Sequence, residues 1–335
     1  MTDIIQAEID EVLADKNIFW QELKGSTVLV TGATGLIGGA LVRVLEGANE
    51  RYGLNINIIA HMRKTHGDIR SNIDIGAKPD YIFHCAAITK SFEMVNNPVE
   101  VINVSIDGTR NVLNLAKAAK SKSVVFLSSM EVYGQTEKVE VCEDDLGYID
   151  LTNPRSCYPE SKRLCEALCT AYYKQFGVPV KIARLAQTFG GGVPSTDTRV
   201  FAQFARSAIR GEDIVLHTKG KSVGNYCYIA DAVRGLLTLL LKGENGQAYN
   251  IANPANSMTI RQMAELVANK ICSGNIRVVV KIPDNIKEYG YSQDVGFTLN
   301  IDKIKELGWF PKYELIEMYK RLIEDWLNRG VEKIK

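Results

Sequence analysis

Tyr158 and Lys162 are the clearest chemical pair in the sequence, and they lie in the stretch SCYPESK. This stretch opens a predicted helix that runs to about Phe176, so one helical turn separates the two side chains and both face the same way. A free tyrosine has a pKa of about 10, which must fall by about 3 units, roughly 4 kcal/mol, for the phenol to act as a base near pH 7. An adjacent ammonium and an oxidised nicotinamide could supply that charge. The pair therefore indicates a tyrosine base, although the spacing alone also fits a surface Tyr–Lys pair.

A second chemical stretch, KGSTVLVTGATGLIGGA, covers residues 24–40 and contains three glycines spaced three apart. Gly32, Gly35 and Gly38 lie where a short apolar strand turns into a helix that begins near Leu36. Such a turn lets backbone N–H groups and the helix N-terminus approach a pyrophosphate without a Cβ in the way. The pattern is GxxGxxG, whereas the usual fingerprint is GxGxxG, so an ordinary turn with packing glycines is the alternative. Because strand, turn and helix fall in register, we predict a dinucleotide site whose contacts also include Thr34, Leu36 and Ile37.

The end of the next predicted strand bears on the choice of cofactor. An acidic residue about 20 positions after the last glycine would bind the ribose 2′-OH of NAD, whereas an arginine accommodates the 2′-phosphate of NADP. Arg63 and Lys64 stand there and no acid does. We therefore expect NAD or NADP with a lean to NADP, and we expect Asp68 and Ile69 to border the adenine. A solvated basic loop is the alternative.

Strand-like apolar runs alternate with helical patterns along the chain, which indicates an α/β fold with a doubly wound parallel sheet. The run at 81–87 ends in the small residues Ala86 and Ala87, which would let a cofactor lie across the strand ends. The run at 123–129 places two hydroxyls, Ser128 and Ser129, at its end. The remaining predicted elements are an amphipathic helix at 2–23, a strand at 55–60, helices at 98–120 and 259–270, strands at 249–252 and 277–282, and a closing helix from 315. The segment 64–79 is too short for a full crossover, so one element there is trimmed or missing.

Composition excludes several classes of protein. A net charge of +1 offers no basic field for nucleic acid, and no apolar run approaches the roughly 20 residues that span a bilayer. Seven cysteines without a CxxC motif and four scattered histidines predict reduced thiols and no metal site. The acidic N-terminus does not fit a signal peptide, so we expect a cytoplasmic protein.

TGATGLIG, HCAA, SSMEVYG and YPESK, in this order, resemble the extended short-chain dehydrogenase/reductase family over about residues 25–330. Nucleotide-sugar epimerases, 4,6-dehydratases and decarboxylases are the most similar branches. The resemblance leaves the N-terminal amphipathic helix, residues 1–24, outside. It implies a Rossmann domain at 25–186 and a smaller C-terminal α/β substrate lobe, mostly 187–335, from which 228–252 returns to the Rossmann domain. It also implies a homodimer paired through the two long helices and a nucleotide diphosphate sugar as substrate.

The resemblance assigns roles to several residues. Ser129 would hydrogen-bond the substrate hydroxyl, Tyr158 would take its proton, and Lys162 would bind the nicotinamide ribose and tune Tyr158. The shared first step would be oxidation of the sugar at C4 to a 4-ketose. Ser128 would lie beside the cofactor, as would Ala86 and Ala87. Substrate contacts would come from Thr89, Glu131, Gln187, Arg199 and Tyr226.

Position 130 helps to choose among the branches, because the dehydratases resemble one another in having an Asp-Glu pair after the hydroxyl residue. This chain has Met130-Glu131, and a thioether cannot donate a proton. A 4-epimerase is therefore favoured, with a decarboxylase that uses Glu131 and Arg199, or a 4,6-dehydratase, as alternatives.

Two positions depart from the family. Gly224 stands where an arginine usually binds the diphosphate, and Gln187 replaces an asparagine. Arg199 or Lys219 could take over the phosphate, or these cations are ordinary solvated loop residues. An NADPH-dependent reductase of a non-sugar ketone and a non-catalytic dinucleotide-sensing scaffold remain open as further alternatives.

Overall fold

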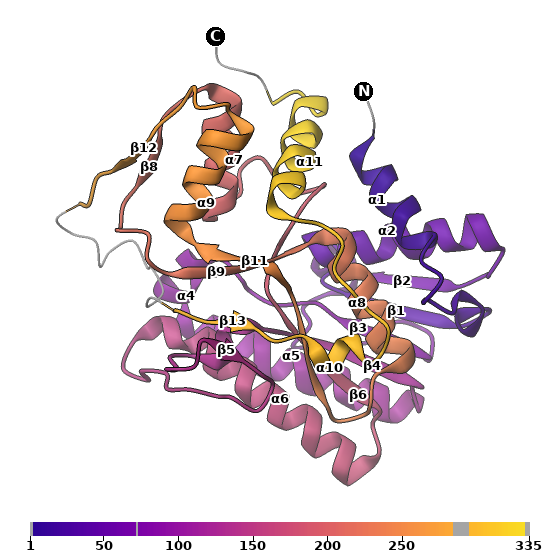
Figure 1. The fold of residues 1–335 in the computed structure, drawn as a ribbon. Helices are drawn as coiled ribbons and strands as arrows, with labels where there is room; N and C mark the ends of the chain where they lie inside the picture. The colour runs from indigo at the N-terminus through magenta and orange to yellow at the C-terminus, as the bar shows by residue number, and fades with distance from the viewer. Residues whose placement is uncertain (1–2, 72, 284–294, 332–335) are drawn as a thin grey trace.

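A six-stranded, fully parallel sheet forms the centre of the computed structural model, which describes residues 3–71, 73–283 and 295–331 (Figure 1). The strand order is β2-β1-β3-β4-β6-β10, and every neighbouring pair is parallel. The order reverses between β1 and β3, which makes this the switch point where doubly wound sheets bind ligands. The strands are β1 (Thr27–Thr31), β2 (Asn57–His61), β3 (Tyr81–His84), β4 (Ser123–Ser129), β6 (Val180–Leu185) and β10 (Ala248–Ile251).

Helices cover both faces of this sheet. On one face lie α5 (Pro98–Ala119) and α6 (Cys157–Phe176), and on the other lie α2 (Leu36–Tyr52) and α8 (Ile229–Lys242). Strand β4 shows why: Val124 and Phe126 pack in the cluster with α5 and α6, whereas Val125 and Leu127 belong to the cluster with α2 and α8. Alternate side chains thus point to opposite, equally apolar faces, as expected for a buried parallel strand.

A second lobe contains the shorter strands and the C-terminal helices. A three-stranded sheet runs in the order β11-β9-β7, and β12 pairs with β8 while β13 pairs with β5. The bounds are β5 (Glu140–Val141), β7 (Gln187–Phe189), β8 (Ile214–Leu216), β9 (Val223–Tyr228), β11 (Asn253–Thr259), β12 (Val278–Val280), β13 (Thr298–Leu299), α7 (Val200–Arg210), α9 (Ile260–Leu266), η4 (Val267–Ile271), α10 (Asp302–Lys305) and α11 (Leu315–Asn328). Short elements between the large ones are α4 (Ser91–Asn96), η2 (Met130–Tyr133) and η3 (Pro154–Ser156).

The N-terminal segment differs from the single helix predicted at 2–23. Helix α1 (Ile4–Leu13) ends early, and η1 (Trp20–Leu23) follows after a turn. The Asp15 carboxylate accepts the backbone N–H of Asn17, which satisfies a turn in place of a further helical bond. Trp20 and Leu23 are buried, so the chain bends to bring them onto the Rossmann core.

The crossover between β2 and β3 is as short as predicted, with only α3 (Arg63–His66) among its described residues. Strand β3 ends at His84, earlier than predicted, because the backbone N–H of Ala86 donates to the Thr31 side chain and not to a strand. Among the residues that the structure describes, no helix combines the length and apolar character needed to cross a bilayer.

Candidate active site

The glycine turn between β1 and α2 has the geometry of a phosphate cradle. Gly32 has a φ of +66°, and a Cβ there would lie 2.8 Å from backbone atoms of Ala86. A Cβ on Gly38 would lie 2.4 Å from the Gly32 carbonyl oxygen, so α2 can start this close to the turn only without a side chain. Gly35 is the N-cap of α2, and no side chain caps the helix. The free N–H groups at this end suit a pyrophosphate, so the residues present fit a dinucleotide.

The neighbouring predicted cofactor contacts lie around this turn. Thr34 is exposed, whereas Leu36 and Ile37 are half-buried in the first turn of α2. Ala86 and Ala87 are half-buried just beyond β3. His84 lies beneath them, bound to Thr31 at 2.8 Å, and burial lowers its pKa to about 3, so this imidazole is neutral and structural.

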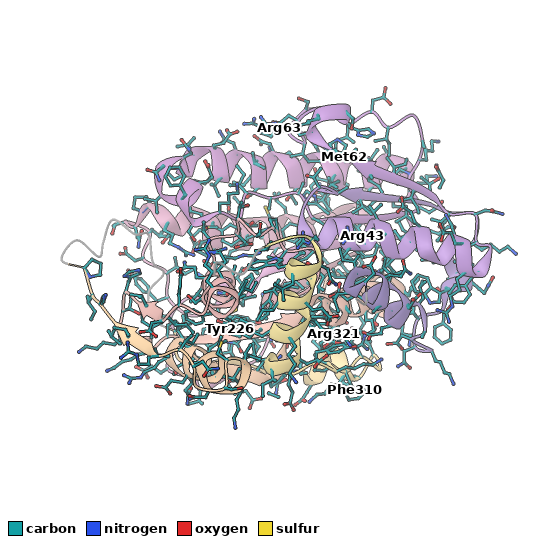
Figure 2. All side chains as sticks on the ribbon, turned by 90° about the horizontal axis from the view of Figure 1, so that it is seen from above. Arg43, Met62, Arg63, Tyr226, Phe310 and Arg321 are labelled. Carbon is teal, nitrogen blue, oxygen red and sulfur yellow. The ribbon has the colours of Figure 1, made fainter. Side chains whose placement is uncertain are left out.

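The end of β2 carries a network of charges. The exposed Arg63 pairs with Asp68 at 3.1 Å, and Arg70 joins the same carboxylate at 2.9 Å. Hydrogen bonds from Arg70 lower the pKa of Asp68 to about 2. Figure 2 labels Arg63, the first residue of α3, and Met62, which precedes it. Ile69 is buried against Gly108 of α5, so its side chain contacts the helix.

The structure brings Ser129, Tyr158 and Lys162 together at the carboxyl end of β4. Ser129 ends the strand, and its side chain lies near enough to Tyr158, at the start of α6, to lower the pKa of the phenol. The Lys162 ammonium donates to the Leu127 carbonyl at 2.7 Å and lies 4.7 Å from the centre of the Phe126 ring. Both Tyr158 and Lys162 are buried, so α6 aims their polar atoms at the strand.

Burial shifts the pKa values of Tyr158 and Lys162 in opposite directions. Burial raises the pKa of Tyr158, the charge of Glu131 reinforces this, and the nearby Ser129 hydroxyl opposes it. Burial lowers the pKa of Lys162. Tyr158 is thus a protonated phenol in this state, and it needs additional nearby positive charge before it can act as a base.

Glu131 and Arg155 form an ion pair beside Tyr158 that the sequence analysis missed. The guanidinium donates to both carboxylate oxygens, at 2.7 and 3.1 Å. Burial alone would lower the pKa of Arg155, but the charge of Glu131 and its hydrogen bonds, with smaller contributions from Tyr158 and Cys157, together raise it. The Arg155 Nε is buried without a partner. The available signal was a basic residue three positions before Tyr158, which is too common to identify a site.

A buried network supports the strand that ends at the site. Ser128 donates to the Glu166 carboxylate at 2.6 Å, and Arg184 of β6 binds the same carboxylate at 2.7 Å. Arg184 also contacts the hydroxyl of Tyr133 at 3.1 Å. Ser128 therefore helps to hold α6 against β4 and β6.

The remaining predicted substrate contacts are spread around this edge. Thr89 is exposed, and Gln187 is exposed at the start of β7. Arg199 pairs with Asp197 at 2.6 Å, and its charge reaches Tyr158. Tyr226, in contrast, is fully buried, so the structure does not bring its side chain to the surface of the site. A Cβ on Gly224 would lie 2.4 Å from the Tyr226 hydroxyl, which explains a glycine there.

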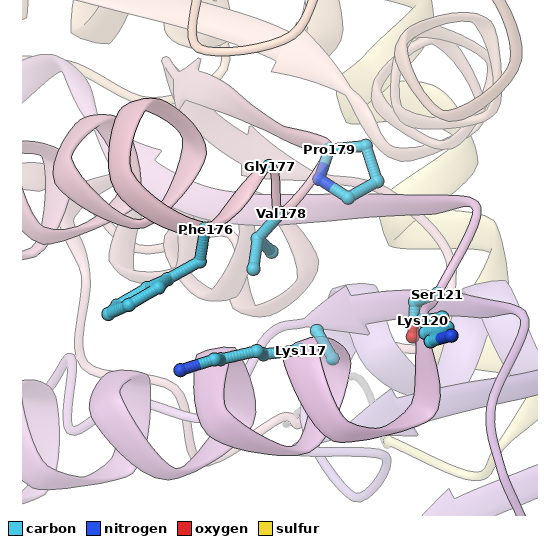
Figure 3. A pocket seen from close by; sticks show the side chains of 8 residues that line it. Lys117, Lys120, Ser121, Phe176, Gly177, Val178 and Pro179 are labelled. Carbon is cyan, nitrogen blue, oxygen red and sulfur yellow. The ribbon is translucent and has the colours of Figure 1, made fainter.

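A surface pocket of about 230 Å³ lies between the C-terminal ends of α5 and α6 (Figure 3). Its lining includes Ser121 and Pro179, which precede β4 and β6, so it borders the amino edge of the sheet and not the carboxyl edge where Ser129 and Tyr158 lie. Within the described ranges, no cluster of His, Cys, Asp and Glu could hold a metal ion.

Comparison with known proteins identifies one family that matches this chain and several solved structures that share its fold. The profile of the NAD dependent epimerase/dehydratase family matches residues 28–252. UDP-glucuronic acid decarboxylase 6 of Arabidopsis thaliana is 32% identical over 323 residues, which cover 91% of this chain and 90% of that protein. The UDP-glucose 4-epimerase of Thermotoga maritima, solved with UDP-glucose, has a TM-score of 0.76 at 24% identity and covers 90% of this chain and 99% of its own. The dTDP-glucose 4,6-dehydratase DesIV of Streptomyces venezuelae, solved with NAD, has a TM-score of 0.72 at 23% identity, covering 91% and 98%. These two solved structures share the fold.

Proposed function

This chain belongs to the NAD dependent epimerase/dehydratase family, and within that family we propose that it oxidises a nucleotide diphosphate sugar at C4. The resemblance to nucleotide-sugar enzymes of the extended short-chain dehydrogenase/reductases is thereby confirmed. The observation that carries the proposal is the approach of Ser129 to Tyr158, close enough to lower the pKa of the phenol, with Lys162 one helical turn away. A binding module would not need this set of three.

In the proposed reaction Ser129 and Tyr158 hold the C4 hydroxyl, and the Tyr158 oxygen takes its proton. A bound oxidised nicotinamide would supply reversible acceptance of hydride. Lys162, whose ammonium lies 5.9 Å from the centre of the Tyr158 ring, would add positive charge that favours the phenolate alongside that of the oxidised nicotinamide. Gly32, Gly35 and Gly38 would hold the pyrophosphate, since they leave the N-terminus of α2 open.

We favour 4-epimerisation as the outcome. Loss of water across C5–C6 requires an acid and a base, but Met130 is buried and has no proton to donate. Glu131 is engaged by Arg155 through both oxygens. An epimerase needs neither group, because the 4-ketose has only to turn and be reduced on its other face.

Decarboxylation of a uronic acid sugar is the second candidate, and Arg155 favours it. Its guanidinium is largely buried beside Tyr158 and has a free Nε, so it could exchange Glu131 for a substrate carboxylate. The Arabidopsis relative is named as a UDP-glucuronic acid decarboxylase, which supports the same candidate. A carboxylate β to the new ketone would leave as carbon dioxide.

The cofactor and the assembly are further parts of the proposal. Arg63 supports NADP, although its pairing with Asp68 means that a 2′-phosphate would compete with a carboxylate for it. A homodimer through α5 and α6 is supported by exposed apolar side chains on α6, Leu164 and Phe176. Sedimentation or light scattering of the purified protein tests this.

The test of the function is incubation with a panel of UDP-, CDP-, GDP- and dTDP-sugars, including uronic acids, read by mass spectrometry and proton NMR. A product of unchanged mass with an altered C4 coupling and no net change in nicotinamide absorbance supports the epimerase. Loss of carbon dioxide supports the decarboxylase, and loss of water contradicts the argument from Met130. Net consumption of NADPH with a non-sugar ketone, and no reaction of any sugar nucleotide, would replace the proposal by a reductase.

A further inference from the structure

Helix α1 lies outside residues 28–252 that match the family profile, yet its residue Ile5 lies close to the start of α2: a Cβ on Gly192 would have both Ile5 and Leu36 within 4.0 Å. It packs on α2 and α8 of the Rossmann domain and also contacts α11 of the second lobe (Figure 1). Three acidic side chains of this segment bind other parts of the protein: those of Glu8 and Glu11 in α1, and that of Asp15 just after the helix. Asp15 pairs with Arg234 of α8 at 2.9 Å, and Glu11 pairs with Arg321 of α11 at 3.0 Å. The segment therefore braces both lobes.

The third carboxylate, that of Glu8, holds the loop that follows β7. Glu8 is 6% exposed and accepts the backbone N–H of Gly191 at 2.7 Å. It also accepts the hydroxyl of Tyr228, the residue before α8. A Cβ on Gly191 would lie 2.7 Å from the second Glu8 oxygen, so the loop has no side chain where the carboxylate sits. The Glu8 carboxylate can therefore bind this loop only because residue 191 has no side chain.

This loop, residues 190–193, lies beside the predicted cofactor cradle. A Cβ on Gly192 would be 3.7 Å from Leu36, the first residue of α2, and 3.5 Å from the Arg43 guanidinium. The chain enters the loop from β7, which follows the carboxyl end of β6, where ligands bind in such sheets. Figure 2 labels Arg43 and also Arg321 of α11, two arginines whose helices both contact α1. A shift of this loop would therefore change the wall of the cradle.

The loop also leads to a predicted substrate residue. Beyond it, Arg206 donates to the backbone carbonyls of Ser195 and Asp197, and Asp197 binds Arg199. Arg199 acts by its charge on Tyr158. The chain that leaves the loop held by Glu8 therefore carries a cation whose charge acts on Tyr158.

We infer that Glu8 is a positioning residue, which fixes loop 190–193 against the N-terminus of α2 and so sets the affinity for the nicotinamide dinucleotide. The inference rests on the proposed function only in that a dinucleotide binds at this turn. Glu8 touches neither reacting atoms nor cofactor, and it acts through the Gly191 N–H. Its contribution comes from a segment beyond the family's matched region.

The experiment compares Glu8→Ala, Glu8→Gln and Glu8→Asp with the unaltered protein by titration with NADH and NADPH, followed by nicotinamide fluorescence. We expect Glu8→Ala to raise the dissociation constant about tenfold, because the Gly191 N–H would be left without its buried acceptor and a lost buried hydrogen bond is worth about that factor in an equilibrium constant. Glu8→Gln, whose amide oxygen still accepts the Gly191 N–H, should stay within about twofold. Asp10→Asn, an exposed carboxylate on the same helix, is the matched control and should change nothing.

Hydrogen exchange of the loop amides gives a second readout. Residues 190–193 should exchange faster in Glu8→Ala and remain protected in Glu8→Gln. If Glu8→Ala binds dinucleotide as tightly as the unaltered protein, or if Gln fails to rescue it, the inference is wrong and α1 is only a brace. If Glu8→Ala does not fold, Glu8→Asp decides, because its shorter carboxylate should weaken binding and an unchanged affinity overturns the inference. If the unaltered protein binds no dinucleotide, the proposed function fails instead.

Discussion

Glu8→Gln should remove a pH dependence from the stability of the protein. Burial raises the pKa of Glu8 from its ordinary value of 4.5 to about 7, against the opposing hydrogen bonds from Tyr228 and Gly191. The folded protein therefore holds this proton more tightly than the unfolded chain does. The stabilisation that results is present in full below about pH 4.5 and is lost as the pH rises through about 7. At pH 8 the buried charge costs about 3 kcal/mol relative to the neutral acid.

Glutamine has nearly the same shape and stays neutral, so it avoids this cost at every pH. We expect the melting temperatures of the two proteins to be close at pH 5 and Glu8→Gln to be higher on the order of 5 °C at pH 8. Differential scanning calorimetry across this range measures the difference, in which the other titrating groups cancel. Asp10→Asn removes an exposed carboxylate from the same helix and is the control for the loss of one negative charge. A Glu8→Gln protein that is less stable at pH 8 would refute the reasoning, since it would mean that the ionised carboxylate is favourable where it lies.

Three further outcomes follow from the site. Tyr158→Phe should lower turnover by about 10³-fold or more, because it removes the proton acceptor, while the dissociation constant for NADH stays within a fewfold; undiminished turnover would exclude Tyr158 as the base. Gly38→Ala should abolish dinucleotide binding, because the added Cβ would lie 2.4 Å from the Gly32 carbonyl oxygen. Gly53→Ala is its control, since nothing lies within 4 Å of the added Cβ there. It should lower the stability of the protein, because Gly53 has a φ of +61°, but leave the affinity for the dinucleotide intact. Arg63→Ala should weaken NADPH binding about tenfold and leave NADH binding unchanged; equal effects on both cofactors would place Arg63 away from the 2′ position.

The central elements were predictable because their residues carry strong local signals. Strand β4 covers the predicted residues 123–129, since a central parallel strand is buried on both faces and shows as one apolar run. Helix α5 starts at the predicted Pro98, which is suited to the first position of a helix. The order of Ser129, Tyr158 and Lys162 was enough to bring them to one place, because β4 and the start of α6 meet at the carboxyl edge.

The ion pair of Glu131 and Arg155 could not be predicted, because it joins two short 3-10 helices, η2 and η3, and no periodicity relates the two positions. The burial of Tyr226 also escaped prediction, since a strand residue is equally able to face solvent or core until its sheet is packed. The predicted helix at 2–23 was too long because its helical spacing says nothing about the side-chain bond from Asp15 that ends it. Local sequence patterns therefore predict helices and strands, but they do not predict polar contacts between residues that are far apart in the sequence.

Loop 190–193 also has a consequence for the order in which the molecule can be assembled. The Gly191 N–H is held by Glu8, which is 183 positions earlier, and the Gly192 N–H is held by Asp325, which is 133 positions later. Trp326 adds a bond to the Val193 carbonyl at 2.8 Å. During synthesis the Rossmann strands can pair as soon as each emerges, but the loop gains its second support only when α11 has been made. Contacts of such long sequence separation form late, so the wall of the cofactor cradle should be among the last parts of the protein to become native, and a ribosome-bound chain that lacks α11 should hold a folded sheet and an unfinished site.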